Sequence, residues 1–186
     1  MKLALIGIGH QGKHHLRFLS QIDGIQPAYL IDIVAEKAVA ASEEYKIPFA
    51  VDFRPHLKEF DAAIIAIPTV DHFRVASELI RAGKHVLIEK PVTATIEEAW
   101  ELSELAKREG VIAQVGLPER FNPVVLKARP EITKPMFIEI HRLGLFSPRS
   151  LHIDVVLDLM IHDLDLLHLF LKEEPAQIDA VGIPIL

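Results

Sequence analysis

The sequence predicts an α/β protein: an N-terminal doubly wound parallel sheet followed by an incomplete α+β unit. One observation behind this prediction is the recurrence of short apolar runs separated by segments of helical period. Strands that are apolar along their whole length are typical of parallel sheets covered by helices on both faces. The other observation is the glycine pattern GIGHQG at residues 7–12, which leaves the first apolar run and enters a helical segment.

The elements of the first unit follow in a regular order. The strand-like runs lie at residues 2–8, 25–31, 47–51, 62–67, 85–89 and 111–116. Helical periodicity occurs between them, with Asp, Ser or Thr before several segments and Gly after some, near 12–20, 35–46, 71–82 and 95–109. This alternation predicts a dinucleotide-binding type of domain over residues 1–117.

The rhythm changes after residue 117. A helical piece near 121–129, a strand-like run at 136–144, a helix at 154–170 and a strand-like run at 176–186 follow. We expect residues 118–186 to begin a second, α+β domain. Two strands flanking one helix make a small sheet with exposed edges, so those edges either pair with another subunit or belong to a chain that stops early.

Composition narrows the class of protein. The 186 residues are half hydrophobic, carry a net charge of −6 and include no cysteine, which excludes disulfides and thiolate metal sites. A reducing cytoplasm is the expected compartment. The first apolar run is too short for a secretory core or a membrane span. There is no basic stripe and only one Trp and two Tyr, so small ligands are the expected partners rather than nucleic acid.

The glycine pattern predicts a Rossmann dinucleotide site. Gly7 suits a tight turn, Gly9 lets a pyrophosphate approach the backbone, and Gly12 packs the helix close to the strand. Asp32 follows 20 residues beyond Gly12, where a carboxylate accepts hydrogen bonds from a ribose diol and repels a 2′-phosphate, which favours NAD over NADP. The alternative is that the glycines only make a turn and Asp32 caps the next helix.

The segment HVLIEKPVT at 85–93 brings a charged pair to the end of a predicted strand. Open α/β sheets bind ligands at the carboxyl ends of their strands, which is where Glu89 and Lys90 fall. Lys90 can donate to a substrate hydroxyl and stabilise developing alkoxide charge. The competing interpretation is a surface lysine before the turn-forming Pro91.

The predicted helix at 154–170 carries charges among apolar residues. At about 100° per residue, Asp154, Asp158, His162, Asp165 and His168 share one face. Asp158 and His162 are four residues apart, so the carboxylate can orient the imidazole for general acid/base work. The alternatives are a solvated helix face, a metal site shared by Asp and His, and, for Asp154 and His168, a helix cap and a partly buried histidine.

These motifs, in this order, resemble the Gfo/Idh/MocA family, named after glucose-fructose oxidoreductase and inositol dehydrogenase. The resemblance rests on GIGHQG, on IPTVDH at 67–72, on AGKHVLIEKP at 82–91, on QVGLPERFNP at 114–123 and on VVLDLMIHDLDLL at 155–167. It implies a Rossmann domain followed by a domain with a large open sheet that forms oligomer contacts. It also implies NAD- or NADP-dependent oxidation of a secondary alcohol of a sugar or cyclitol.

The resemblance also implies site residues. The family's catalytic lysine, aspartate and histidine fall on Lys90, Asp158 and His162. Its cofactor contacts fall on Gly7, Ile8, Gly9, His10, Gln11, Gly12, Asp32, Pro68, Thr69, His72, Glu89 and Lys90. Within the family the motifs are most similar to members of the UDP-N-acetylglucosamine 3-dehydrogenase type. That similarity implies contacts to a nucleotide-sugar from Arg120, Asn122, Arg142 and Arg149.

Two functions follow from the sequence. One is hydride transfer between NAD and a sugar, possible substrates including a UDP-amino sugar, in a homo-oligomer. The other is a non-catalytic NAD(H)-binding protein with an assembly or sensing role, because the family is longer and we expect this chain to lack much of the second sheet. The family also implies a cis Lys90–Pro91 bond.

Overall fold

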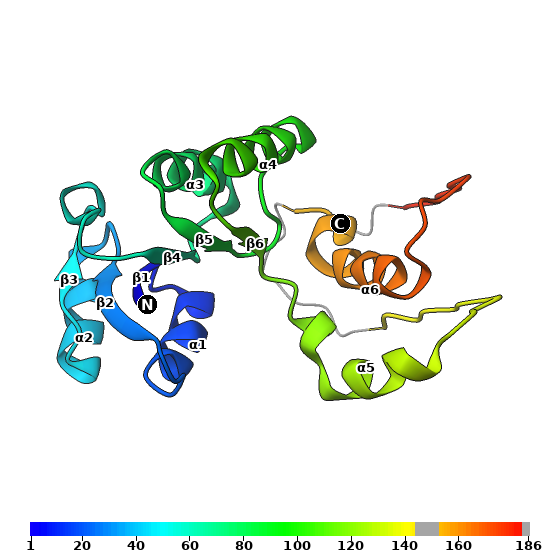
Figure 1. Ribbon diagram of the computed structural model, residues 1–186, viewed down its shortest axis with the longest axis horizontal. Helices are drawn as coiled ribbons and strands as arrows, with labels where there is room; N and C mark the ends of the chain where they lie inside the picture. Colours follow the sequence, from blue (N-terminus) through cyan, green and yellow to red (C-terminus); the bar gives the residue numbers. More distant parts are fainter. Residues whose placement is uncertain (144–152, 184–186) are drawn as a thin grey trace. The chain divides into compact units, whose positions relative to one another are not determined.

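The computed structural model describes residues 1–143 and 153–183. The chain divides into two compact units, Met1–Gly116 and Leu117–Leu186. The first unit holds the sheet and its helices, and the regular elements of the second unit are helical. Figure 1 colours the chain from the N-terminus in blue to the C-terminus in red.

The first unit is built on a six-stranded parallel sheet of order β3-β2-β1-β4-β5-β6. The strands are β1 (Lys2–Ile6), β2 (Gln26–Ile31), β3 (Phe49–Ala50), β4 (Ala62–Ile65), β5 (His85–Ile88) and β6 (Ala113–Val115). All six predicted strands are present, each shorter than its apolar run. The order reverses between β1 and β4, and this switch point is where doubly wound sheets bind ligands. The predicted fold class is confirmed.

Helices cover both faces of this sheet. The helices are α1 (His10–Leu19), α2 (Ala35–Tyr45), α3 (His72–Arg81) and α4 (Ile96–Glu109), with short 3₁₀ turns η1 (Arg54–His56) and η2 (Thr69–Asp71). Figure 1 shows α1 and α2 on one side of the sheet and α3 and α4 on the other. The α4 helix begins with a capping box, in which Thr95 and Glu98 satisfy each other's backbone N–H groups.

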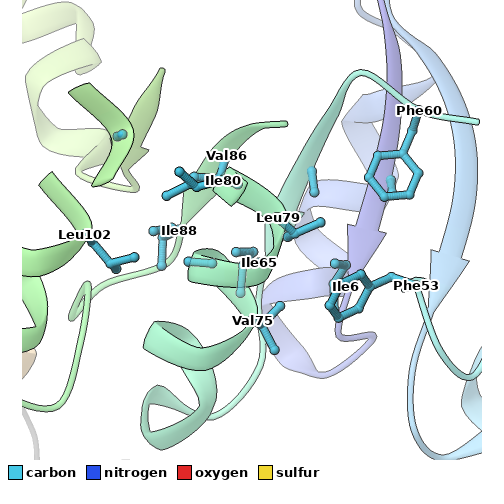
Figure 2. Close-up of a cluster of buried hydrophobic side chains, with 14 of the residues drawn as sticks. Ile6, Phe53, Phe60, Ile65, Val75, Leu79, Ile80, Val86, Ile88 and Leu102 are labelled. Atoms are coloured by element: carbon cyan, nitrogen blue, oxygen red, sulfur yellow. The ribbon is translucent and has the colours of Figure 1, made fainter. Parts of the chain in front are cut away.

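The alternation of side chains along the strands gives two hydrophobic cores. Leu3 and Leu5 of β1 pack with buried residues of α1 and α2. Ala4 and Ile6, which point the other way, pack with α3 and α4. Figure 2 shows this second core, where side chains from β1, β4 and β5 meet those of α3 and α4. The sheet is thereby held rigid beneath the strand ends that carry the candidate site.

The second unit contains η3 (Pro118–Phe121), α5 (Pro123–Ala128), η4 (Arg129–Glu131), a π-helical turn η5 (Val156–Met160) and α6 (Ile161–Leu171). The strand predictions at 136–144 and 176–186 are wrong for the described parts, 136–143 and 176–183, which belong to no ladder. A strand needs a hydrogen-bonded neighbour, and within the described residues neither segment pairs with another. Their apolar side chains, among them Phe137 and Val181, are exposed instead.

Candidate functional site

The loop between β1 and α1 is shaped by its glycines. Gly7 has φ +92°, and a Cβ there would lie 2.3 Å from the carbonyl oxygen of Ala66 on the neighbouring strand's end. A Cβ on Gly12 would lie 1.9 Å from the Gly7 carbonyl oxygen. Nothing lies within 4 Å of a Cβ on Gly9, the residue before α1. The loop therefore has no space for a side chain at Gly7 or Gly12, whereas the space beside Gly9 is open, as the approach of a diphosphate requires.

Asp32 ties this loop to the end of β2. Its Oδ2 accepts the Ile8 backbone N–H at 2.8 Å, and its Oδ1 accepts the Val34 backbone N–H at 2.9 Å. Each carboxylate oxygen has a second lone pair, which remains suitable for a ribose hydroxyl. The alternative that Asp32 only caps α2 does not account for its bond to the glycine loop.

A cleft of about 660 Å³ lies above these strand ends, within the size range of small-molecule sites. Eight of the predicted cofactor residues line it: Gly7, Gly9, His10, Gln11, Asp32, Pro68, Glu89 and Lys90. Ile8 and Gly12 are buried behind it. Thr69 follows Pro68 in η2, where it is half-buried and is not part of the lining. The structure thus brings most of the predicted cofactor residues to one surface.

His72 has a different position from the one predicted for a cofactor contact. Only 1% of it is exposed. Its Nδ1 lies 2.9 Å from the Pro91 carbonyl oxygen, and its Nε2 lies 2.9 Å from the Ile67 carbonyl oxygen. It therefore holds together two cleft-bordering turns without reaching the cleft surface. The Lys90–Pro91 bond that it anchors is cis, as the family resemblance implies.

Two contributors to the cleft were missed by sequence reasoning. His15 of α1 contacts Glu89 with Nε2 to Oε1 at 2.6 Å. Arg54 lines the outer cleft, and its guanidinium is bound to Asp52 and Glu78. No local pattern marks either residue, because the His15–Glu89 and Arg54–Glu78 contacts join positions 74 and 24 residues apart.

The second unit carries the other proposed catalytic residues. Asp158 lies in the π-helical turn η5 and His162 in the first turn of α6, and both are half-buried. The predicted continuous α-helix is thus interrupted at Asp158. The cap prediction for Asp154 is confirmed, since its Oδ1 accepts the Leu157 N–H at 2.9 Å. His168 is exposed, so the interpretation as a partly buried histidine is wrong.

Two arginines explain the remaining acidic residues of this stretch. Arg120 donates to Asp165 at 2.7 Å, and Arg142 donates through Nε and Nη2 to Asp163 at 2.8 and 2.6 Å. Both aspartates are 7% exposed, so a buried carboxylate is neutralised in each pair. The Arg142 hydrogen bond lowers the pKa of Asp163, against a smaller raising effect of burial.

These contacts bear on the predicted substrate residues. The guanidinium groups of Arg120 and Arg142 are engaged by carboxylates of α6, because buried acids need a charged partner. Asn122 caps α5 through its side-chain oxygen, which accepts the Val124 N–H at 3.0 Å. Arg149 lies outside the described residues. The alternative of a solvated helix face does not hold for Asp165, which is 7% exposed and paired with Arg120.

Two further properties concern ions and membranes. Across residues 1–143 and 153–183, no three His, Asp or Glu side chains converge as a metal-binding group. None of the helices in those ranges combines the length and hydropathy needed to cross a bilayer.

Fold and site together define a dinucleotide-binding Rossmann protein: the parallel sheet order, the open glycine loop, the Asp32 carboxylate and the cleft all fit such a cofactor. A family model described as an oxidoreductase family with an NAD-binding Rossmann fold matches residues 1–117. The chain belongs to this family, Gfo/Idh/MocA. The match confirms the predicted family and NAD as its cofactor.

Several relatives extend the comparison to the whole chain. UDP-N-acetylglucosamine 3-dehydrogenase of Acidithiobacillus ferrooxidans is 39% identical over 98% of this chain. A solved structure of that protein superposes with a TM-score of 0.92 and 38% identity, covering 99% of this chain and 60% of its own. The scyllo-inositol 2-dehydrogenase (NAD⁺) of Bacillus subtilis is 28% identical over 98% of this chain. The chain spans 58% and 57% of the lengths of these two curated relatives.

Proposed function

We propose that the chain carries the cofactor domain and the catalytic residues of an NAD-dependent oxidoreductase that transfers hydride between nicotinamide and a secondary alcohol of a sugar. The proposed substrate class is a UDP-amino sugar, such as UDP-N-acetylglucosamine. The observation that carries the proposal is the cleft that places Asp32, the open glycine loop and Lys90 on one surface. The named activity of the Acidithiobacillus relative supports the substrate class.

The roles of the residues follow from their chemistry. The N–H groups at the start of α1 and the loop backbone bind the diphosphate, and Asp32 binds the adenosine ribose. When bound, NAD⁺ supplies the hydride acceptor. Lys90 is assigned to the hydroxyl oxygen of the sugar, where its ammonium group stabilises the developing negative charge. His162 is assigned to take the hydroxyl proton, and Asp158 to orient its ring.

Arg120 and Arg142 are not assigned to the diphosphate of a nucleotide-sugar. Their guanidinium groups neutralise Asp165 and Asp163, and moving either to a ligand would leave a buried acid without its cation. The proposed partners are a small sugar or nucleotide-sugar and a second copy of the chain, and the proposed compartment is the cytoplasm. The absence of cysteine is what favours that compartment.

The test is a screen of UDP-N-acetylglucosamine, free sugars and inositols for NADH formation, followed by absorbance. Lys90→Ala and His162→Ala should each lower turnover by about 10²-fold or more and leave NADH affinity within a few-fold of the original chain. The matched controls are Lys58→Ala and His168→Ala, whose side chains are exposed and outside the cleft lining.

A second result separates the two functions. A chain that turns over none of these compounds, yet shows a higher melting temperature with NAD, is a non-catalytic NAD(H)-binding protein. That outcome is favoured by one observation, the exposed apolar residues of 136–143 and 176–183, which suit assembly. Unchanged turnover in both Lys90→Ala and His162→Ala would defeat the catalytic assignment.

A further inference from the structure

His15 and Glu89 form a close contact between two elements of the first unit that the cofactor site depends on. His15 lies in the second turn of α1, the helix that starts at the glycine loop, and Glu89 follows β5 immediately before Lys90. Nε2 and Oε1 are 2.6 Å apart, and the two side chains are only 25% and 17% exposed. The pair spans 74 positions of sequence and joins the diphosphate end of the site to the strand end that carries Lys90.

The environment of Glu89 keeps it ionised. Burial raises its pKa, but the His15 hydrogen bond and charge, together with the Lys90 backbone N–H, lower it by more, so that the pKa lies below its ordinary value. Gly116 faces the carboxylate, since a Cβ there would lie 3.4 Å from the carboxyl carbon and both oxygens. Glu89 is therefore a fixed negative charge in the wall of the cleft, directly beside Lys90.

His15 itself does not line the cleft, although Glu89 and Lys90 both do. Without His15, the half-buried carboxylate would need another donor, because an ion that is buried and unpaired costs several kcal/mol. A carboxylate that has lost this partner is expected to move from its place in the cleft wall toward water.

We propose that His15 is a positioning residue of the dinucleotide cleft: by holding Glu89 it keeps the cleft wall beside Lys90 in place. This inference rests on the proposed function. It assigns His15 no contact with the cofactor or the sugar, and it predicts that every effect of His15 passes through Glu89.

The first unit offers a matched control for a merely structural role. His56 and Glu59 form the same kind of pair, with Nδ1 2.9 Å from Oε1, and neither lines the cleft. A histidine–glutamate bond that only stabilises the fold should behave alike at both places. One that positions the cleft should change ligand binding at His15 alone.

The experiment measures the dissociation constant of NADH by its fluorescence, with the melting temperature of each variant, for the full chain. His15→Leu should weaken NADH binding about tenfold, because Glu89 loses the partner that fixes it in the cleft wall. His15→Gln, whose side-chain N–H can still donate to Glu89, should stay within about threefold of the original chain. Any effect of His56→Leu should be limited to a lower melting temperature, and the NADH dissociation constant should not change.

A double-mutant cycle tests whether His15 acts through Glu89. If it does, His15→Leu combined with Glu89→Gln binds NADH no more weakly than Glu89→Gln alone. Additive losses overturn the proposal, as does NADH binding by His15→Leu equal to that of the original chain. If His15→Leu does not fold, the same cycle is run with His15→Ala. The proposal is also overturned if His15→Gln binds NADH more than tenfold more weakly than the original chain does.

The two proposals fail in different ways. A chain that binds no NADH overturns both. A chain that binds NADH and shows the His15 effects, but oxidises no sugar, overturns only the proposed function.

Discussion

Replacing glycines 9 and 12 of the loop by alanine should separate folding from cofactor binding. In Gly12→Ala, the new Cβ would lie 1.9 Å from the Gly7 carbonyl oxygen, and real Cβ contacts are essentially never shorter than 3.0 Å. The atom it meets is backbone, held by the turn at Gly7, so α1 must move away from the loop by about 1 Å. Overpacking of this kind costs roughly 1–3 kcal/mol.

That cost corresponds to a melting temperature lowered by roughly 4–15 °C for a unit of this size. The shifted helix start should also weaken NADH binding, because its N–H groups no longer face the diphosphate. In Gly9→Ala nothing lies within 4 Å of the new Cβ, so the melting temperature should change by about 1 °C or less. The Cβ of this variant points into the space that the diphosphate would occupy, so NADH binding should fall as far as in Gly12→Ala.

Thermal unfolding and NADH fluorescence titration, run on both variants, check this reasoning. It is refuted if Gly12→Ala melts with the original chain, or if Gly9→Ala is destabilised as much as Gly12→Ala. Wild-type affinity in Gly9→Ala would mean that the diphosphate does not pass over the loop.

Three further substitutions have defined outcomes. Asp32→Ala should weaken NADH binding about tenfold or more. It should also reduce the preference for NADH over NADPH, measured as the ratio of the two dissociation constants. His72→Leu should lower the free energy of unfolding by about 1–3 kcal/mol in denaturant titration, because a buried backbone carbonyl loses the imidazole N–H that it accepts, with little change in NADH affinity. Arg142→Gln should lower the free energy of unfolding at neutral pH. It should also make that free energy fall less steeply as the pH is lowered. The folded-state pKa of Asp163 is depressed, so the stabilisation is present above about pH 4, the unfolded pKa, and is lost as pH falls through the folded pKa. Denaturation from pH 2 to 7 measures it.

The first unit could be predicted from sequence because its signals are local. Each strand is an apolar run, each helix has its own period, and the glycine loop and Asp32 mark the cofactor end of the sheet at a known spacing. The contacts that complete the site are not local. His15 reaches Glu89 across 74 positions, and His72 joins two turns through backbone carbonyls, which no residue pattern records.

The second unit was harder to predict for two physical reasons. Alternating apolar residues at 136–143 indicate strand character, but strand formation depends on a neighbour that sequence periodicity cannot supply. The acids of α6 were assigned by helical angle alone, whereas their burial is decided by arginines 45 and 21 positions upstream. A charged residue on an apolar helix therefore has to be read together with distant residues of opposite charge.

The aspartates between Asp154 and Asp165 differ in the interactions that explain their presence. Asp154 caps the helix start, and Asp163 and Asp165 neutralise arginines, so each of these three has a structural explanation within its own unit. Asp158 lies instead in a π-helical turn, a form that occurs mostly as a single turn at functional sites.

Packing does not explain that turn. Three of its four apolar members, Val156, Leu159 and Met160, are each more than 40% exposed, and the fourth, Leu157, is half-buried, so none of the four is fully buried. A π-helical turn at the carboxylate that precedes His162 is a local backbone feature that fits the roles proposed for Asp158 and His162.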